Sequence, residues 1–522
     1  MKSARVNLRL AAPAIVLASL LLLPFLNKPF SIDDPLFLRA AEHALADPAH
    51  PADFEEVWNA GDRLRLSQYM LGGTLPAYVL APVAALGSRE WVAHLYQWLF
   101  LGVFLVACVA VARRLGCDAR QASVAALLAG SNPVTLAMAA TCMPDLMAAT
   151  FGTIGIERVL AFREERGKGA GALAALLLAA AVLCRASTAP LLAVAALLLW
   201  PAEWKRAAAM WPVAAAAALV AAGAVVNRGA GGGTVASSFQ ALTAMRNVPR
   251  NAVSFLGYQA LTGPILVYWM FARGRRALAL VAVMITAGGA LSLASAANLR
   301  QYAVPAALGV CFLAAILDLA RELRRAVPLF VWLGSGLVAL PYVYMSAKYL
   351  LPGVPAAALL IVLHGARAGQ RRYSLAVAVL VALGWIAGAL IIVGDTTLAS
   401  SQRAEVEREV PRLVGRGYTV WAGGQWAFLG YAQRAGARAL ANQPPLPRPG
   451  DLILISALSY YGNFDRMPID REYLYSTRER RCGVFVLNRA LHAGFFSNRF
   501  GYLPFAIGCG EVDRYDLFRV LP

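Results

Sequence analysis

The chain has 522 residues, of which 59% are hydrophobic and only 15% are charged, and its formal net charge is +19. Because a soluble domain has about 45–50% apolar residues, this composition excludes an ordinary soluble enzyme. The apolar residues come in blocks of about 15–22, long enough to cross a bilayer as helices. A positive net charge could indicate a nucleic-acid partner, but arginines in loops between spans are better explained by orientation in a membrane. We therefore expect contacts with membrane lipids and no nucleic acid.

The first predicted element is the apolar segment from Leu10 to Leu26, which follows a basic N-terminus. It could be a signal peptide, but no small-x-small cleavage site precedes Asp33, so we interpret it as a retained anchor. Two adjacent aspartates, Asp33 and Asp34, come directly after it. Two carboxylates at a membrane surface repel each other and are costly to desolvate, which favours a functional role. A solvated loop that begins a helix is the alternative, since Asp is a common N-cap.

Thirteen spans are predicted in all. They are residues 10–26, 91–112, 121–140, 146–162, 170–184, 188–200, 207–226, 261–272, 277–296, 303–320, 327–344, 350–365 and 375–393. The segment 72–86 is apolar but short, and it contains two prolines. If it crossed the membrane, the basic loops would no longer lie on one side but on alternating sides. We therefore predict a re-entrant or surface-lying helix there, within a first outer loop of residues 27–90.

Alternate loops are rich in Arg and Lys, beginning with the N-terminus, while the longer opposite loops hold fewer basic residues. The positive-inside rule then predicts a multi-pass protein of the inner (plasma) membrane with a cytoplasmic N-terminus. An odd number of spans places residues 394–522 outside the cytoplasm, where Cys482 and Cys509 could form a disulfide.

The tail has the composition of a soluble domain and a β-α-β order of predicted elements. We predict strands at 417–421, 451–456, 481–487 and 514–521, and a helix at 426–435. The predicted fold class is therefore an all-α polytopic membrane domain, residues 1–393, followed by a small extracytoplasmic α/β domain, residues 394–522.

Polar residues that could carry chemistry gather at the outer ends of the predicted spans. Besides the aspartate pair, Asp145 lies where the third span ends and the fourth begins, which a helix cap would also explain. The cations at the same level are Arg185, Arg246, Arg250, Arg300 and Lys348. Each could snorkel to lipid head groups, but Arg185 and Arg300 adjoin apolar sequence, where an unpaired charge is expensive.

Carboxylates that face arginines at a membrane surface suit a group transfer from a lipid phosphate. A carboxylate can take a proton from an acceptor hydroxyl or amine, and arginines can hold a phosphate leaving group. A lipid carrier needs no nucleotide, in agreement with the lack of a Gly-rich phosphate loop after any predicted strand. Three outer carboxylates could also hold a divalent cation, whereas the five histidines form no ligand set.

This order of motifs resembles the GT-C superfamily of membrane glycosyltransferases, and within it family 39, which includes protein O-mannosyltransferases and the lipid A aminoarabinose transferase. The resemblance covers residues 1–320. Its motifs are Asp33-Asp34, Leu86-Gly87, Asn132-Pro133, Met143-Pro144-Asp145 and Arg300-Gln301-Tyr302-Ala303-Val304-Pro305. Three positions depart from the family: Leu71-Gly72 where His-Pro or Lys-Pro is frequent, His94 where Arg is frequent, and Arg185-Ala186 in place of Lys-Gly. The resemblance implies Asp33 as the catalytic base and a reaction without a metal.

The sequence thus predicts a glycosyltransferase with no cofactor. Its expected partners are a polyprenyl-phosphate-linked sugar donor and an envelope acceptor that is a lipid, a polysaccharide or a protein. Asp34 and Asp145 are expected to assist Asp33, and the candidate donor-phosphate ligands are Arg185, Arg300, Arg246, Arg250 and Tyr302. Two alternatives stay open. A transporter or flippase should show charged or broken helices at mid-membrane, and an assembly protein would use its tail to bind a cell-wall partner.

Overall fold

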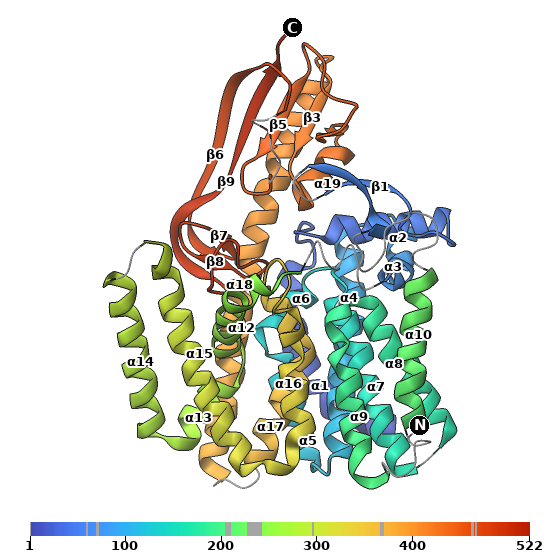
Figure 1. The fold of residues 1–522 in the computed structure, drawn as a ribbon, viewed down its shortest axis with the longest axis vertical. Helices are drawn as coiled ribbons and strands as arrows, with labels where there is room; N and C mark the ends of the chain where they lie inside the picture. Colours follow the sequence, from blue (N-terminus) through green and yellow to red (C-terminus); the bar gives the residue numbers. More distant parts are fainter. Residues whose placement is uncertain are drawn as a thin grey trace.

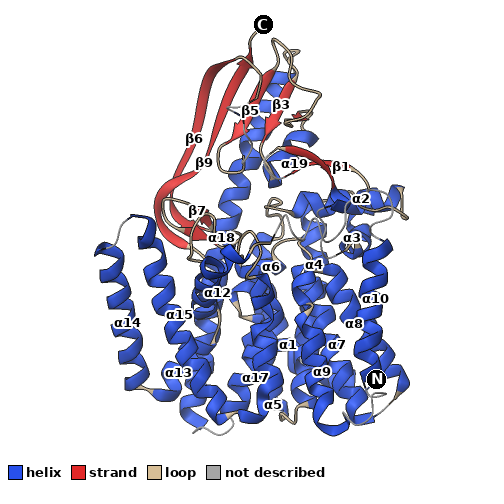
Figure 2. Cartoon of the chain, in the orientation of Figure 1, coloured by secondary structure: helices blue, strands red, loops and turns tan. Residues whose placement is uncertain are grey.

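The computed structural model of the chain describes residues 2–58, 61–68, 73–165, 167–203, 210–226, 243–294, 297–365, 370–460, 464 and 467–522. A bundle of helices forms the lower part of the molecule in Figure 1, and a domain built on a sheet stands above it. Figure 2 shows the division by secondary structure, with strands almost confined to the upper part. The N-terminus lies at the lower end of the bundle and the C-terminus at the top.

The bundle consists of helices of very different lengths. In chain order they are α1 (Lys2–Leu22), α4 (Glu90–Arg114), α5 (Ala119–Gly130), α6 (Pro133–Ala139), α7 (Asp145–Glu165), α8 (Lys168–Cys184), α9 (Pro190–Glu203), α10 (Trp211–Val226), α12 (Val248–Thr262), α13 (Ile265–Arg273), α14 (Arg275–Ala294), α15 (Ala297–Glu322), α16 (Val327–Leu333), α17 (Val354–Gly365) and α18 (Gln370–Val414). Two 3-10 segments, η7 (Gly334–Ala339) and η8 (Ala347–Gly353), connect α16 to α17.

Among the described residues, six helices are long and apolar enough to cross a membrane. The number is seven if α5 and α6, which meet at an angle of 63°, form one broken span. The prediction of a polytopic helical membrane part is confirmed, but the predicted number of thirteen spans is not. Prolines and glycines divide several predicted spans: Pro133 begins α6, and Gly263-Pro264 separates α12 from α13 inside the predicted span 261–272.

The first long connection lies over the upper end of the bundle (Figure 1). It contains α2 (Asp34–Ala46), the hairpin of β1 (Glu55–Trp58) and β2 (Asp62–Arg65), and α3 (Leu75–Ala85). Helix α3 occupies the segment for which a surface-lying helix was predicted. Helices α2 and α3 bury a small apolar cluster of their own, which includes Leu36, Ala40 and Ala77.

Helix α18 joins the two parts of the molecule, because it rises through the bundle and continues without a break into the upper domain (Figure 1). The upper domain has a five-stranded sheet with the strand order β4-β3-β5-β9-β6. Its elements are β3 (Val420–Gly423), α19 (Trp426–Arg434), β4 (Arg438–Ala439), β5 (Leu452–Ser456), β6 (Arg471–Phe485) and β9 (Ala506–Val520). Strands β3 and β5 are parallel, as a β-α-β order requires, and β9 is antiparallel to both β5 and β6.

The two longest strands, β6 and β9, form an arm that leads back down to the bundle (Figure 1). Cys482 and Cys509 face each other in the β6–β9 register and form a disulfide. The residues between the strands, 486–505, contain the short strands β7 (Leu487–Asn488) and β8 (Ala493–Gly494). We call this segment the descending loop, because it reaches the upper end of the bundle.

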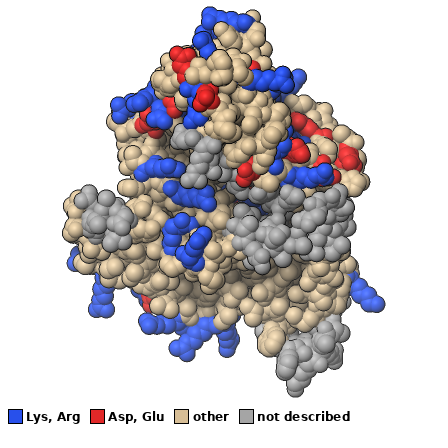
Figure 3. Space-filling model, turned by 45° about the horizontal axis from the view of Figure 1, so that its top comes forward, with Lys and Arg blue, Asp and Glu red and all other residues tan. Residues whose placement is uncertain are grey.

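The surface charge is unevenly distributed. In Figure 3, Lys and Arg side chains line the lower edge of the face shown, whereas nearly all the visible acidic side chains lie on the upper part. Between them the described surface of this face is mostly uncharged, apart from a group of Lys and Arg side chains just below the upper part.

Candidate active site

The aspartate pair lies in a tight turn that connects the end of α1 to α2. Ile32, directly before Asp33, has a φ of +47°, which a β-branched residue rarely adopts. The carboxylate of Asp34 stabilises the turn, because its Oδ2 accepts a hydrogen bond from the Ser31 N–H at 3.0 Å and its Oδ1 accepts one from the Cys142 N–H at 2.9 Å. Backbone strain of this kind is concentrated at functional sites. We call residues 30–35 the aspartate turn.

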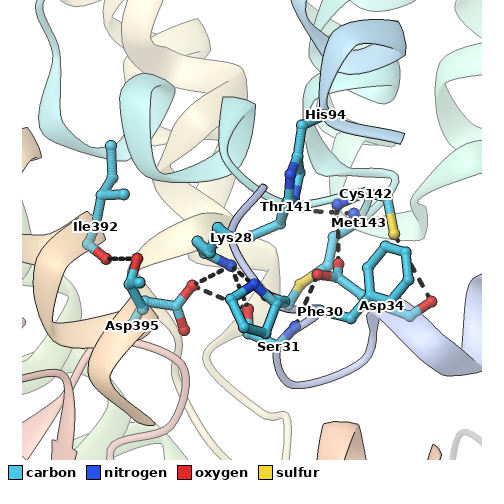
Figure 4. A network of polar contacts seen from close by, with 12 residues as sticks. Lys28, Phe30, Ser31, Asp34, His94, Thr141, Cys142, Met143, Ile392 and Asp395 are labelled. Atoms are coloured by element: carbon cyan, nitrogen blue, oxygen red, sulfur yellow. Dashed lines mark hydrogen bonds and ion pairs between the residues drawn. The ribbon is translucent and has the colours of Figure 1, made fainter. Parts of the chain in front are cut away.

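The two aspartates differ in environment. Asp34 is completely buried, and burial raises its pKa to about 6 although Lys28 and the two backbone donors lower it. Its carboxylate faces the backbone of Ser31 and Cys142, as Figure 4 shows. The side chain of Asp33 is 14% exposed, and its Oδ2 lies 3.3 Å from Nζ of Lys348. Of the pair, Asp33 is therefore the one that an external group can reach.

A buried ion pair ties the aspartate turn to α18. The ammonium of Lys28 lies 2.9 Å from Oδ2 of Asp395, and the side chains are 0% and 4% exposed. The Ser31 hydroxyl lies between them, since it donates to Asp395 Oδ2 at 2.9 Å and lies 3.1 Å from Lys28 Nζ (Figure 4). Sequence reasoning missed this network. The only local signal was an aspartate two residues beyond the predicted span 375–393.

The second predicted motif contributes another ion pair. Asp145 begins α7 and is almost fully buried. Nε and Nη2 of Arg185, which follows α8, donate to its Oδ1 and Oδ2, both at 3.0 Å. The guanidinium of Arg185 also lies 5.9 Å from the ring centroid of Phe37 and 6.0 Å from that of Tyr349. Such a bidentate pair between rings holds both groups in one orientation.

Three tyrosines near η8 connect these charges. The ring centroid of Tyr342 lies 5.1 Å from that of Tyr344 and 6.2 Å from that of Tyr349. Tyr349 links this group to Arg185, whose guanidinium lies 6.0 Å from its ring centroid. The structure therefore brings together Asp33, Lys348, Asp145, Arg185 and the tyrosines at the upper end of the bundle. The sequence placed Lys348 among the outer cations but did not select it as a phosphate ligand, and it did not select these three tyrosines.

The remaining predicted phosphate ligands are placed differently. Arg250, in the first turn of α12, donates from Nη2 to the Val343 carbonyl at 2.7 Å, and its Nε is buried with no hydrogen-bond partner in the described part of the chain. Arg246 is exposed. The Tyr302 hydroxyl accepts a hydrogen bond from the Tyr502 hydroxyl at 2.8 Å. Arg300 lies in α15, but its side chain lies outside the described residues. No group of three or more His, Cys, Asp or Glu residues that could hold a metal ion occurs within the described ranges.

Comparison with known proteins gives distant structural similarities. No protein-family model and no curated protein matches the chain. The chain is similar to ArnT from Cupriavidus metallidurans bound to undecaprenyl phosphate, with 15% identity, a TM-score of 0.46, and coverage of 86% of this chain and 92% of that one. It is also similar to an oligosaccharyltransferase from Archaeoglobus fulgidus (11% identity, TM-score 0.44, 83% of this chain and 64% of that one). A third is the arabinosyltransferase EmbB from Mycobacterium smegmatis, with 13% identity, a TM-score of 0.37, and coverage of 76% of this chain and 41% of that one. At these values the similarity assigns no activity and no residue role to this chain.

Proposed function

We propose that the chain is a membrane glycosyltransferase of the GT-C type, which moves a sugar from a polyprenyl-phosphate carrier to an acceptor at the outer face of the membrane. The observation that carries the proposal is the partly exposed carboxylate of Asp33, which lies beside the buried Lys348 and near the Asp145–Arg185 pair. A carboxylate that stays accessible can accept a proton, and fixed cations stabilise the negative charge that develops on a leaving group.

In this reaction the acceptor hydroxyl or amine forms a bond to the anomeric carbon of the donor sugar. The bond between that carbon and the phosphate oxygen breaks, and its electron pair stays on the phosphate. The proton of the acceptor passes to Asp33, and the carrier leaves as polyprenyl phosphate. The sugar, the carrier and the acceptor supply all the reacting atoms, so no nucleotide and no redox partner takes part.

The other residues have supporting roles in this proposal. Asp34 fixes the aspartate turn through two backbone hydrogen bonds and does not touch the substrate. Asp145 and Arg185 orient the donor or the acceptor as a rigid pair. Arg250 binds the donor phosphate, because its buried Nε–H has no partner within the described residues and a phosphate oxygen would accept from it.

The orientation in the membrane is part of the proposal. The site and residues 394–522 would lie outside the cytoplasm, and the N-terminus inside. The two chain ends lie at opposite ends of the molecule (Figure 1), which supports this arrangement. The disulfide between Cys482 and Cys509 supports it as well, since disulfides persist in oxidising compartments.

One feature favours the alternative of a transporter, namely the sharp break between α5 and α6, because transporters use broken helices to expose backbone groups to a substrate. Here the amide of Asn132, the residue at the break, is already used. Oδ1 of Asn132 accepts from the Val134 N–H at 2.9 Å, and its Nδ2 donates to the Thr262 carbonyl at 2.9 Å. The break therefore offers no free polar group from Asn132, and the transferase is the better supported function.

The test is an activity assay on the purified full chain in nanodiscs. A panel of polyprenyl-phosphate sugars is offered with membrane extract as the source of acceptor, and the release of polyprenyl phosphate is measured. The proposal expects one donor to be consumed with transfer of its sugar to the extract. Flipping of the sugar lipid in sealed vesicles, with no consumption of any donor, would contradict it and support the transporter.

A further inference from the structure

The descending loop of the upper domain is firmly attached to the bundle beside the candidate site. The carbonyl of Phe495 accepts from the Ala347 N–H at 2.8 Å and from the Ser346 hydroxyl at 3.0 Å. These two residues directly precede Lys348, the partner of Asp33. A shift of the descending loop would therefore move the cation that lies next to the proposed base.

Asn498 makes the attachment specific. Its backbone N–H donates to the Met345 carbonyl and its Oδ1 accepts from the Met345 N–H, both at 2.9 Å. Its Nδ2 donates to Oδ1 of Asn251 at 2.9 Å and to the Ser254 hydroxyl at 2.8 Å. Both N–H donors and the oxygen of this amide thus bind the bundle at two separate places, which gives the loop one defined position.

The next residue, Arg499, extends this contact towards the site. Its guanidinium lies 6.0 Å from the ring centroid of Tyr344, the tyrosine that packs against Tyr342. The ring centroids of Tyr342 and Tyr344 are 5.1 Å apart, so Arg499 lies against the same group of tyrosines that Arg185 contacts through Tyr349. Arg499 is exposed, and within the described residues it has no carboxylate at ion-pair distance.

Arg250 contacts the same segment as Arg499, because its Nη2 donates to the carbonyl of Val343, the residue between Tyr342 and Tyr344. Arg250 precedes Asn251, which binds Asn498, so Arg250 and Arg499 flank one hydrogen-bonded pair of asparagines. Arg250, too, has no carboxylate partner in the described part of the chain, and its buried Nε is without an acceptor. Two guanidinium groups that have no carboxylate partner among the described residues, one from each domain, thus lie at the edge of the site.

The charges inside the site explain why these two arginines are needed. Lys348 is paired with Asp33, and Arg185 with Asp145, so these four groups sum to zero charge. A phosphate that leaves with an added negative charge is stabilised further by cations that have no carboxylate partner. We propose that Arg499, supplied by the C-terminal domain, binds the phosphate of the polyprenyl carrier together with Arg250. The C-terminal domain is then a part of the donor site, an inference that rests on the proposed function.

The test compares Arg499→Ala with Arg489→Ala in the full chain in nanodiscs. Arg489 is a matched control, because it is an exposed arginine of the same loop that lies over Phe500, 5.3 Å from its ring centroid, and not over the tyrosines. Direct binding of polyprenyl phosphate is measured, with polyprenyl alcohol as the ligand that lacks the phosphate. Loss of a charge-assisted hydrogen bond should weaken phosphate binding by about 10- to 100-fold in Arg499→Ala. The control and alcohol binding should stay within about twofold, the typical scale for surface changes away from a site.

Arg499→Lys keeps the charge and should recover part of the affinity. Unchanged phosphate binding in Arg499→Ala would overturn the inference, and so would an equal loss in Arg489→Ala or an effect on the acceptor KM alone. Wild-type protein that binds polyprenyl phosphate through Arg499 but transfers no sugar would overturn the proposed function and support the inference. A failure of the inference about Arg499 can therefore be distinguished from a failure of the proposed function.

Discussion

Replacing Lys28 with Met tests the network beneath the aspartate turn. Met retains much of the side-chain volume but removes the ammonium that lies 2.9 Å from Asp395. Asp395 then remains buried with Ser31 as its main partner, because its Oδ1 has no hydrogen-bond partner among the described residues. Breaking a buried ion pair by removing one partner costs about 3–5 kcal/mol. We therefore expect a marked fall in the melting temperature of Lys28→Met, and a fall in transfer rate because the turn carries Asp33.

The assay is thermal unfolding in one detergent, with two further variants. Lys28→Met combined with Asp395→Leu removes both charges and should recover most of the lost stability, since an apolar pair replaces a buried ion pair at little cost. Arg403→Met is the matched control, because Arg403 also links α18 to the first part of the chain, at 3.3 Å from Glu90, but is 36% exposed. Its effect should stay at or below about 1 kcal/mol. A single variant as stable as wild type, or a double variant as unstable as the single one, would refute the reasoning.

Three further predictions concern other parts of the molecule. The folded-state pKa of Asp34, about 6, lies above its ordinary 3.8, so its contribution to stability falls as pH rises from about 4 to 6, by up to about 3 kcal/mol. Between about pH 4 and 6 the melting temperature of Asp34→Asn should fall less than that of wild type. An equal fall with pH in the two proteins would contradict the raised pKa of Asp34. Replacing Cys482 and Cys509 with Ser opens a bridge across 27 residues and should cost about 3.5 kcal/mol in chemical unfolding. If the free energy of unfolding hardly changed, the hydrogen bonds between β6 and β9 would be enough to hold the two strands together without the disulfide. Arg185→Lys keeps the charge but loses the bidentate contact with Asp145, so transfer should slow by about tenfold, and a wild-type rate would exclude a role for that geometry.

Features encoded in contiguous residues could be predicted from the sequence. The apolar blocks identified the helical membrane part, since hydrophobic length is a local property. The order of β3, α19 and β5 followed from short strand patterns separated by turn residues. The count of spans was less predictable, because Pro and Gly break helices that look continuous by hydropathy, as at Gly263-Pro264.

The pairing of charges could not be predicted, because the partners are far apart in the chain. Lys348 and Asp33 are 315 residues apart, and Asp395, the partner of Lys28, lies 364 residues beyond Ser31, which donates to it. The family resemblance distinguished Asp33 from Asp34, but the chemistry of the two adjacent residues gave no reason to do so. Only the fold shows that Asp34 faces two backbone N–H groups, whereas Asp33 remains accessible. Asp145 and Arg185 were each expected at the site, but their mutual pairing appears only in three dimensions.

The most direct test of the central claim compares the transfer rate of Asp33→Asn with that of wild type on the donor identified in the panel. The amide retains the shape and an oxygen that can accept from Lys348, but it cannot take a proton from the acceptor. General-base catalysis contributes about 10²- to 10⁴-fold, so kcat should fall at least 100-fold while the protein stays folded and binds polyprenyl phosphate. A folded Asp33→Asn protein that transfers sugar at a rate near that of wild type would show that Asp33 is not the base.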